Sequence, residues 1–261
     1  MLYYLNSLIF QEFFMQYLKM LPFQLREAIE KNTPVILPLG VIEYHAEHLP
    51  LGVDCFTCLE SIDRLEKKHP EVIVLPPFCY GSASYAVAKP EGNGTVHVDS
   101  EHVLKVAEDI FRSLLRVGFR NIHGYIAHQH EEFVQGMPTD LAFRFAARRV
   151  IFEFLEKNTG EGWWGTEKFS AYYSEDNNPF NYIRIHPCLP APERYHEFPV
   201  DHAGKNETSI TLASHPETVH MDKLDNSIWY SRAGVEGSAE YGNASLNAIV
   251  EEMEKTLGLV K

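Results

Sequence analysis

The sequence contains few cysteines and few basic residues, and each shortage excludes a class of protein. Four cysteines among 261 residues cannot form a disulfide scaffold, so we expect a reducing compartment, the cytoplasm. Cys55 and Cys58 form an isolated C-x-x-C without a second pair, and we interpret them as small apolar residues at the start of a helix. Only 23 Lys and Arg oppose 36 Asp and Glu, for a net charge of −13. Because an acidic surface repels phosphate backbones and anionic lipids, we expect no nucleic-acid partner and no membrane partner.

Long apolar runs are also missing, and the nearest approach to one is at the N-terminus. Residues 1–21 are rich in Leu, Tyr and Phe but are interrupted by Gln11, Glu12 and Lys19, whereas a spanning helix needs about 20 mostly apolar residues. We expect an amphipathic helical extension at about residues 1–22 that packs on the body or on another subunit. No repeat or flexible linker divides the remainder, so residues 1–261 are predicted to form a single domain.

Short apolar runs between turn residues alternate with stretches of helical periodicity. The runs predict buried strands over residues 34–40, 72–75 and about 121–127, and the alternation at 149–155 predicts another. Helices are expected over residues 22–32, 56–68, 100–117, 138–147 and 243–257, and residues 201–213 should begin as a loop and become a helix or strand. This order indicates an α/β fold with a mainly parallel sheet covered on both faces. Ligands in such folds bind beyond the carboxyl ends of the strands.

Side chains that prefer metals follow the first predicted strand directly. Residues 40–54 include Glu43, His45 and Asp54. In an extended segment, residues i and i+2 point the same way, so Glu43 and His45 can face one cation. Asp54 returns after a Pro-Leu-Gly turn and can bridge two ions. The alternative is a solvated polar loop, but the ligand preferences of zinc and its neighbours favour a metal site.

Two further clusters supply imidazoles and another carboxylate. His128 and His130 follow the third predicted strand. Each alone could be an ordinary core or surface histidine, but with the first cluster they give five candidate ligands, enough for one or two divalent ions per subunit. His202 stands beside a glycine and is a candidate general acid for a departing amine. Glu207 could ligate metal, orient His202 or cap the following element.

Together these segments resemble the creatininase (creatinine amidohydrolase) family. The family pattern P-L-G-S-x-E-Q-H-G-x-H-L-P-L-x-T-D is similar to P-L-G-V-I-E-Y-H-A-E-H-L-P-L-G-V-D, which ends at Asp54. Gly94-Thr95 is similar to the family's G-T, and residues 201–209 are similar to its H-A-G-x-x-E-T-S element. The resemblance spans roughly residues 34–219.

The resemblance implies a three-layer α/β/α fold, zinc as the metal with manganese or iron as alternatives, and a ring of subunits, often six. The matching positions imply metal ligation by Glu43, His45, Asp54 and His128, with Asp54 as the bridge, and an acid/base role for His202. The family's aromatic flap near the substrate would correspond to Trp163 or Trp164. Thr95 is expected beside the same substrate.

The chain departs from the family pattern around the second cluster. Creatininase reads N-G-H-Y-E-N where this chain has I-A-H-Q-H-E, so His130 stands in place of a glutamate ligand. A neutral imidazole in place of a carboxylate suits zinc better than manganese. It also argues against creatinine as the substrate and allows for a single firmly held ion.

The sequence therefore predicts a metal-dependent amidohydrolase that cleaves a non-peptide C–N bond in a small cyclic amide, amide or formamide by metal-activated water. The alternative is a catalytically impaired member of the same fold that still binds metal and ligand. A two-metal phosphoesterase is a third and weaker interpretation, because no Gly-rich phosphate cradle followed by Lys and Ser or Thr is present.

Overall fold

The fold is built on one parallel sheet. The computed structural model describes residues 15–172 and 178–260. Five strands lie in the order β1-β3-β2-β4-β5, and every pair is parallel. The strands are β1 (Met15–Gln16), β2 (Val35–Leu39), β3 (Ile73–Val74), β4 (Ile122–Ile126) and β5 (Ile183–Pro187). Their carboxyl ends therefore meet at a single edge of the sheet.

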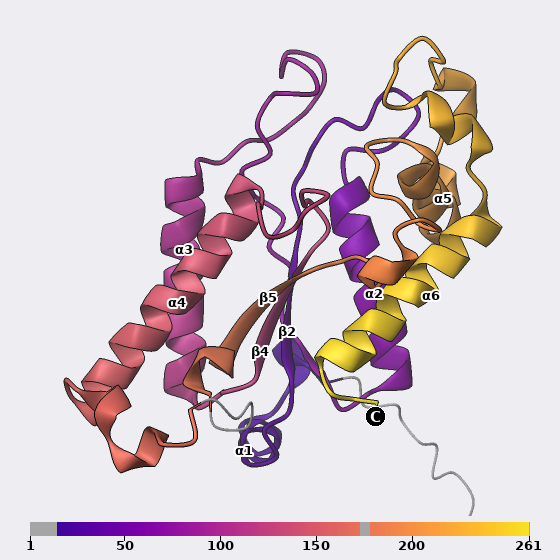
Figure 1. Ribbon diagram of the computed structural model, residues 1–261. Coiled ribbons are helices and arrows are strands. Elements are labelled where there is room, and N and C mark those ends of the chain that lie inside the picture. The colour runs from indigo at the N-terminus through magenta and orange to yellow at the C-terminus, as the bar shows by residue number, and fades with distance from the viewer. Residues whose placement is uncertain (1–14, 173–177, 261) are drawn as a thin grey trace, which may run out of the picture.

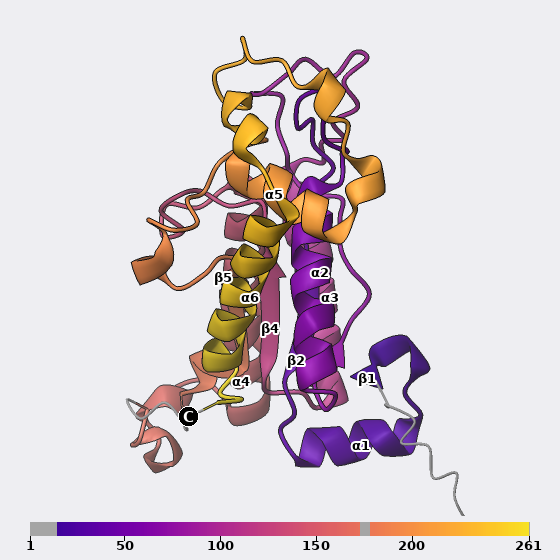
Figure 2. The ribbon, with the colours of Figure 1, turned by 90° about the vertical axis from the view of Figure 1, so that its right-hand side faces the viewer.

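Helices cover both faces of this sheet, as a three-layer α/β/α fold requires (Figure 1). One layer holds α3 (Ser100–Val117) and α4 (Pro138–Thr159), and the opposite layer holds α2 (Val53–Lys68), α5 (Lys205–Ser214) and α6 (Ala239–Thr256). The helix α1 (Pro22–Glu30) lies beneath the sheet, at the end where β2 begins (Figure 2). Short 3₁₀ turns occur at Tyr17–Lys19, Trp163–Gly165, Glu167–Phe169, Pro179–Tyr182, Pro192–Arg194, Pro216–Thr218, Met221–Lys223 and Arg232–Glu236.

Alternation along the central strands divides the core into two apolar layers. All five residues of β2 are buried. Val35, Leu37 and Leu39 join the cluster under α3 and α4, whereas Ile36 joins the cluster under α2 and α6. This two-residue period is what a strand buried on both faces produces, and it explains why the run is apolar throughout.

The central elements agree with the expectations from the sequence. The strands expected over residues 34–40, 72–75 and 121–127 correspond to β2, β3 and β4, and the expected helix over 100–117 is α3. Gly118 ends α3 with φ of 129°, a conformation that favours glycine. Cys55 and Cys58 are unpaired and buried in α2, as expected of small apolar residues.

The expected strand over residues 149–155 was wrong, because α4 continues through it to Thr159. The buried side chains along α4 recur at helical spacing, through Ala146, Ala147, Val150, Ile151 and Leu155. The alternation of Phe152, Glu153 and Phe154 within this stretch imitates that of a strand. The strand β5 was missed in turn, since only one of its five residues is fully buried.

The expected N-terminal helix over residues 1–22 lies mostly outside the described residues. Within the described part, Met15–Gln16 form the edge strand β1 and Tyr17–Lys19 form a 3₁₀ turn. Pairing of β1 with β3 places this segment in the sheet rather than on a helix. In the described part of the chain, no helix has both the length and the apolar character needed to cross a bilayer.

A buried pair of histidines crosses from β4 to β5. His123 Nε2 donates to Asn121 Oδ1 at 2.7 Å, which leaves His123 Nδ1 to accept from His186 Nε2 at 3.0 Å. The network requires a neutral His123, because a protonated ring has no lone pair on Nδ1 with which to accept. Burial, reinforced by the charge of Arg184, lowers the pKa of His186 to about 4, and burial followed by the neighbouring His186 lowers the pKa of His123 further.

Acid should therefore destabilise the fold through this pair. Because the folded pKa values lie below the unfolded value of about 6.5, the unfolded chain binds more protons between pH 6.5 and 4. The free energy of unfolding should fall by about 2 kcal/mol per pH unit across that window, about 1 from each histidine. Urea unfolding at pH 7, 6 and 5 measures the slope. In His186→Gln the slope should be shallower, and an unchanged slope would show that other groups cause the acid sensitivity.

Candidate metal centre

Six acidic and imidazole side chains converge beyond the carboxyl ends of β2 and β4. They come from the loop after β2, the first turn of α2, the loop after β4 and the start of α5, and they are Glu43, His45, Asp54, His128, His202 and Glu207. All but His202 and Glu207 are buried, and those two are partly buried. The site therefore lies at the edge of the sheet where the topology predicts ligand binding.

The loop after β2 is held in place by backbone and side-chain hydrogen bonds. Glu43 N donates to Leu51 O at 3.0 Å, which closes the loop. Thr95 Oγ1 accepts from Tyr44 N at 3.0 Å. Thr95 thus braces the loop that carries the candidate ligands, whereas its expected contact with substrate stays a prediction. Ala46 has a positive φ of 58°, a conformation that favours the glycine of the family pattern at this position.

His45 and Asp54 are oriented by their local structure. His45 Nδ1 donates to Glu43 O at 3.0 Å, so the lone pair of its Nε2 faces the cluster. The helix α2 begins at Val53, earlier than the expected Phe56, and this places Asp54 in its first turn. The N-terminal end of a helix favours a negative side chain. A hydrogen bond thus orients His45, and the first turn of α2 places Asp54 beside it.

The cluster contains overlapping triads of possible ligand atoms. Glu43, Asp54 and His128 form one triad, and His45, Asp54 and Glu207 form another. Within each triad the ligand atoms lie within 4.8 Å of one another. A third group at this spacing joins Glu43, His45 and His202. Asp54 belongs to the first two triads, as expected of a carboxylate that bridges two ions.

The two carboxyl oxygens of Asp54 face different histidines. Asp54 Oδ1 is 3.7 Å from His45 Nε2, and Asp54 Oδ2 is 3.4 Å from His128 Nδ1. In the described part of the chain, His45 Nε2, Asp54 Oδ2 and His128 Nε2 are buried atoms without a hydrogen-bond partner. Buried polar atoms are normally paired. Ligation of a divalent cation would satisfy the first two, and the nitrogen and oxygen donors suit zinc, manganese or iron.

The electrostatics of the cluster favour added positive charge. Burial alone would lower the pKa of His45, but Glu207, Asp54 and Glu43 raise it to about 10. The pKa of His128 is shifted in the same direction: burial opposes protonation, yet the adjacent carboxylates of Asp54 and Glu43 raise the pKa to about 10. Burial raises the pKa of Glu207 to about 8. Carboxylates gathered in a buried site hold either protons or a cation, because unpaired negative charge there is costly.

Glu207 lies where a metal ligand is needed, one of the three roles that the sequence left open, and its ligation of a metal stays a prediction. Its Oε2 accepts from Ala203 N at 2.6 Å, just before α5 begins, and the same atom lies 3.5 Å from His45 Nε2. His202 is oriented by a different group, since its Nε2 donates to Tyr44 O at 3.0 Å. His202 Nδ1 then faces inward, 4.0 Å from Glu43 Oε2. Burial, reinforced by the charge of His45, lowers the pKa of His202 to about 4.

The structure does not bring His130 into the cluster. The chain bends at residues 127–128 and again at 131–132, and His130 Nδ1 accepts from Glu132 N at 3.0 Å while its side chain is one third exposed. The i, i+2 argument requires a regular extended backbone, which these bends interrupt. Glu207 occupies the position beside His45 and Asp54, so a carboxylate is present in the second triad after all.

Two substitutions test whether Glu207, rather than His130, ligates the metal. Glu207→Gln keeps the oxygen that accepts from Ala203 N but removes the negative charge, and it should weaken metal binding by about 100-fold. His130→Ala is the matched control and should leave metal content unchanged. Elemental analysis of protein purified without chelator measures both. Loss of metal from His130→Ala alone would contradict the assignment.

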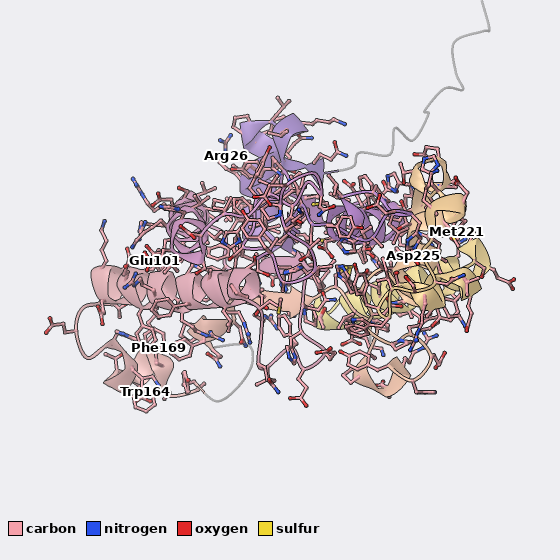
Figure 3. All side chains as sticks on the ribbon, turned by 90° about the horizontal axis from the view of Figure 1, so that it is seen from above. Arg26, Glu101, Trp164, Phe169, Met221 and Asp225 are labelled. Atoms are coloured by element: carbon pink, nitrogen blue, oxygen red, sulfur yellow. The ribbon has the colours of Figure 1, made fainter. Side chains whose placement is uncertain are left out.

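Trp163 and Trp164 lie away from the cluster, which corrects the expected flap. They follow the carboxyl end of α4, a helix that starts near the site and runs 22 residues to the opposite end of the molecule (Figure 1). Trp163 is buried with its ring 5.1 Å from Phe169. Seen along the sheet, Trp164 and Phe169 lie on the opposite side from Met221 and Asp225, whose segment borders the site (Figure 3).

Tyr230 borders the site and was missed from the sequence. Its ring meets the His202 ring edge-on, with centroids 5.4 Å apart. Residues 215–236 contain only short 3₁₀ turns among irregular backbone. Neither periodicity nor a motif therefore marked the segment, and only the fold brings it to His202.

Comparisons with known proteins agree with this geometry. The family model for creatininase, described as creatinine amidohydrolase, matches residues 19–257. The creatinine amidohydrolase of Pseudomonas putida is 24% identical over 192 residues, 73% of this chain and 67% of that protein. The 3-dehydro-scyllo-inosose hydrolase of Thermotoga maritima is 26% identical over 205 residues, 76% of this chain but only 56% of that protein. A solved manganese form of creatininase superposes with a TM-score of 0.67 at 17% identity, covering 93% of this chain and 97% of that one, which shows the shared fold.

Proposed function

Since the chain belongs to the creatininase family, we propose that it is a metal-dependent hydrolase of a non-peptide C–N bond in a small cyclic amide, amide or formamide. The observation that carries the proposal is the position of Asp54, shared by two buried triads of nitrogen and oxygen ligands beyond the strand ends. A divalent cation bound there would polarise a carbonyl and acidify a water molecule.

The chain's own residues supply the proton transfer. Hydrolysis adds water to the carbonyl carbon and breaks the C–N bond, so one proton must move from water to the departing nitrogen. His202 is suited to carry it, because Tyr44 O fixes the proton on Nε2 and leaves the Nδ1 lone pair directed into the site. Amines are poor leaving groups unless protonated, so a positioned acid at Nδ1 accelerates the cleavage.

We propose zinc or manganese as the metal, with iron as a further alternative. Each of the two triads offers one imidazole and two carboxylates, a set that both ions accept. Because Glu207 supplies the carboxylate that His130 does not, the second triad keeps its negative charge and manganese is not disfavoured. Structures of related creatininases include a manganese form and a Zn–Zn form.

The relatives support a ring-shaped substrate. One relative is named for creatinine, a cyclic amide, and the other for an inosose, a carbocyclic ketone. Both names denote small rings that bear a carbonyl. The second name favours an alternative function, hydrolytic opening of a carbocyclic ketone at a C–C bond, with the same ligands polarising the ring carbonyl.

A substrate panel tests the proposal directly. Protein purified without chelator is assayed with creatinine, hydantoin, a formamide and a cyclic 1,3-diketone, before and after metal removal and reloading. Turnover of a C–N substrate that disappears with the metal and returns on reloading supports the proposal, and turnover of the diketone alone supports the alternative. If none is hydrolysed while ring compounds still raise the melting temperature, the chain is a binding protein.

We further propose a homo-oligomer of six subunits that works in the cytoplasm. Exposed apolar side chains on the α3 and α4 layer support an interface there, namely Val106, Leu141, Phe145 and Phe152. Light scattering should give a mass near six times 29.9 kDa. A mass of one subunit would contradict the assembly without affecting the proposed chemistry.

A further inference from the structure

The segment between α5 and α6 folds back onto the metal centre and is fixed at its base. His220 N donates to His48 O at 2.9 Å. Gly234 packs so closely that an added Cβ would lie 2.9 Å from Thr208 Oγ1 and 3.1 Å from His48 Nε2. Ser231 is fully buried. The backbone on both sides of Trp229 and Tyr230 is therefore anchored to the loop after β2 and to α5.

Tyr230 rests on this base and faces His202. It packs against a small apolar cluster that includes Ala46, Val53 and Ala203. Its ring stands edge-on to His202 at 5.4 Å and 67°. Burial and then the charge of Glu47 raise the pKa of Tyr230. Glu47 Oε1 in turn accepts from Tyr44 OH at 2.8 Å.

Trp229 lies next to Tyr230, on the side that faces solvent, so that His202, Tyr230 and Trp229 form a row of rings. Its ring lies 5.7 Å from Tyr230 at 87°, and the residue is 77% exposed. Single exposed apolar residues are common on protein surfaces. The position of this one is unusual, because the row His202, Tyr230, Trp229 leads from the proton-carrying imidazole to the surface. An aromatic face left open beside a reactive group is suited to stack a planar ligand.

We propose that Trp229 and Tyr230 form the wall of the substrate site, against which a planar ring stacks with its carbonyl directed toward Asp54 and His202. This inference rests on the proposed function and assigns its substrate contacts to the segment between α5 and α6. The aromatic faces and the nearby carboxylate of Glu47 attract positive charge. The wall therefore selects neutral or cationic rings over rings that carry a carboxylate.

Two readouts in matched variants test the wall. Binding of hydantoin and creatinine is followed by isothermal titration calorimetry in metal-free protein, and KM and kcat are measured for whichever compound the metal-loaded enzyme hydrolyses. Trp229→Ala should raise Kd and KM about tenfold with kcat changed less than about twofold, because a stacking contact is lost while the proton transfer is untouched. Trp229→Phe should recover most of the affinity. Trp164→Phe, at the far end of the molecule, should bind as the unaltered protein does.

The charge preference adds a second comparison. Hydantoin-5-acetate, which carries a carboxylate, should bind the unaltered protein about tenfold more weakly than hydantoin. In Glu47→Gln the affinities of the two compounds should differ less, because the repelling negative charge is gone. Equal affinities of the unaltered protein and Trp229→Ala for every ring would overturn the wall, as would a failure of the unaltered protein to bind any of them. If ring binding depends on Trp229 but no ring is hydrolysed, the proposed wall stands and the proposed hydrolysis is refuted. If a ring is hydrolysed with the same KM in Trp229→Ala and the unaltered protein, the proposed hydrolysis stands and the wall is refuted.

Discussion

Asp54→Ala should release the bound metal and lower hydrolysis by about 1000-fold or more, the largest effect expected of any single substitution. Asp54 is the member common to the two triads, with Oδ1 toward His45 and Oδ2 toward His128. Without it, each triad keeps only two ligand residues. Elemental analysis and turnover of the same preparation measure both consequences.

The matched control for this substitution lies on the same helix. Asp63 is exposed on α2 and pairs with Lys67 at 2.5 Å, so Asp63→Ala should retain full metal and activity. Asp54→Asn preserves the shape of the side chain and should still lose metal, because a neutral amide is a poor ligand for a hard cation. Full metal content in Asp54→Ala would refute the bridging role, whatever the activity.

His202→Ala should retain the metal and lose turnover by about 100- to 10,000-fold, the range typical of a removed general acid. The imidazole is held by Tyr44 O, with Nδ1 directed at the site. The substitution leaves Glu43, Asp54, His128, His45 and Glu207 in place, so the two triads remain complete. Binding of substrate should change much less than kcat.

Metal content decides between two roles for His202. Glu43, His45 and His202 also lie within ligand distance of one another, and loss of metal from His202→Ala would make this histidine a ligand rather than the proton carrier. His196 offers a control, since it is an exposed histidine. His196→Ala should change neither metal content nor turnover.

Much of the metal centre could be predicted because its residues follow buried strands directly. The apolar runs at β2 and β4 are unmistakable, and parallel strands bring their carboxyl ends together whatever the loops do. This topology predicted that Glu43, His45 and His128 lie near one another, and the family resemblance implied that they ligate a metal. Glu207 was a candidate as well, but its place beside His45 depends on where α5 begins.

The errors arose where tertiary packing overrides local pattern. His130 has the same spacing from His128 as His45 has from Glu43, yet residues 43–45 contain no bend, whereas the second loop bends at residues 127–128 and 131–132. Trp163 and Trp164 were the conspicuous aromatics, but α4 carries the chain to the other end of the molecule before reaching them. Tyr230 gave no local signal because its place depends on contacts with residues far away in the sequence.

The contact between His202 and Tyr44 joins residues 158 positions apart. His45 and Glu207 are likewise far apart in the sequence. A cation held between Asp54, His45 and Glu207 would link the loop after β2 to α5, and this link can form only after α5 has been synthesised and has packed in place. Native-state stability should then rise with free metal concentration, since only the folded chain presents the complete set of ligands.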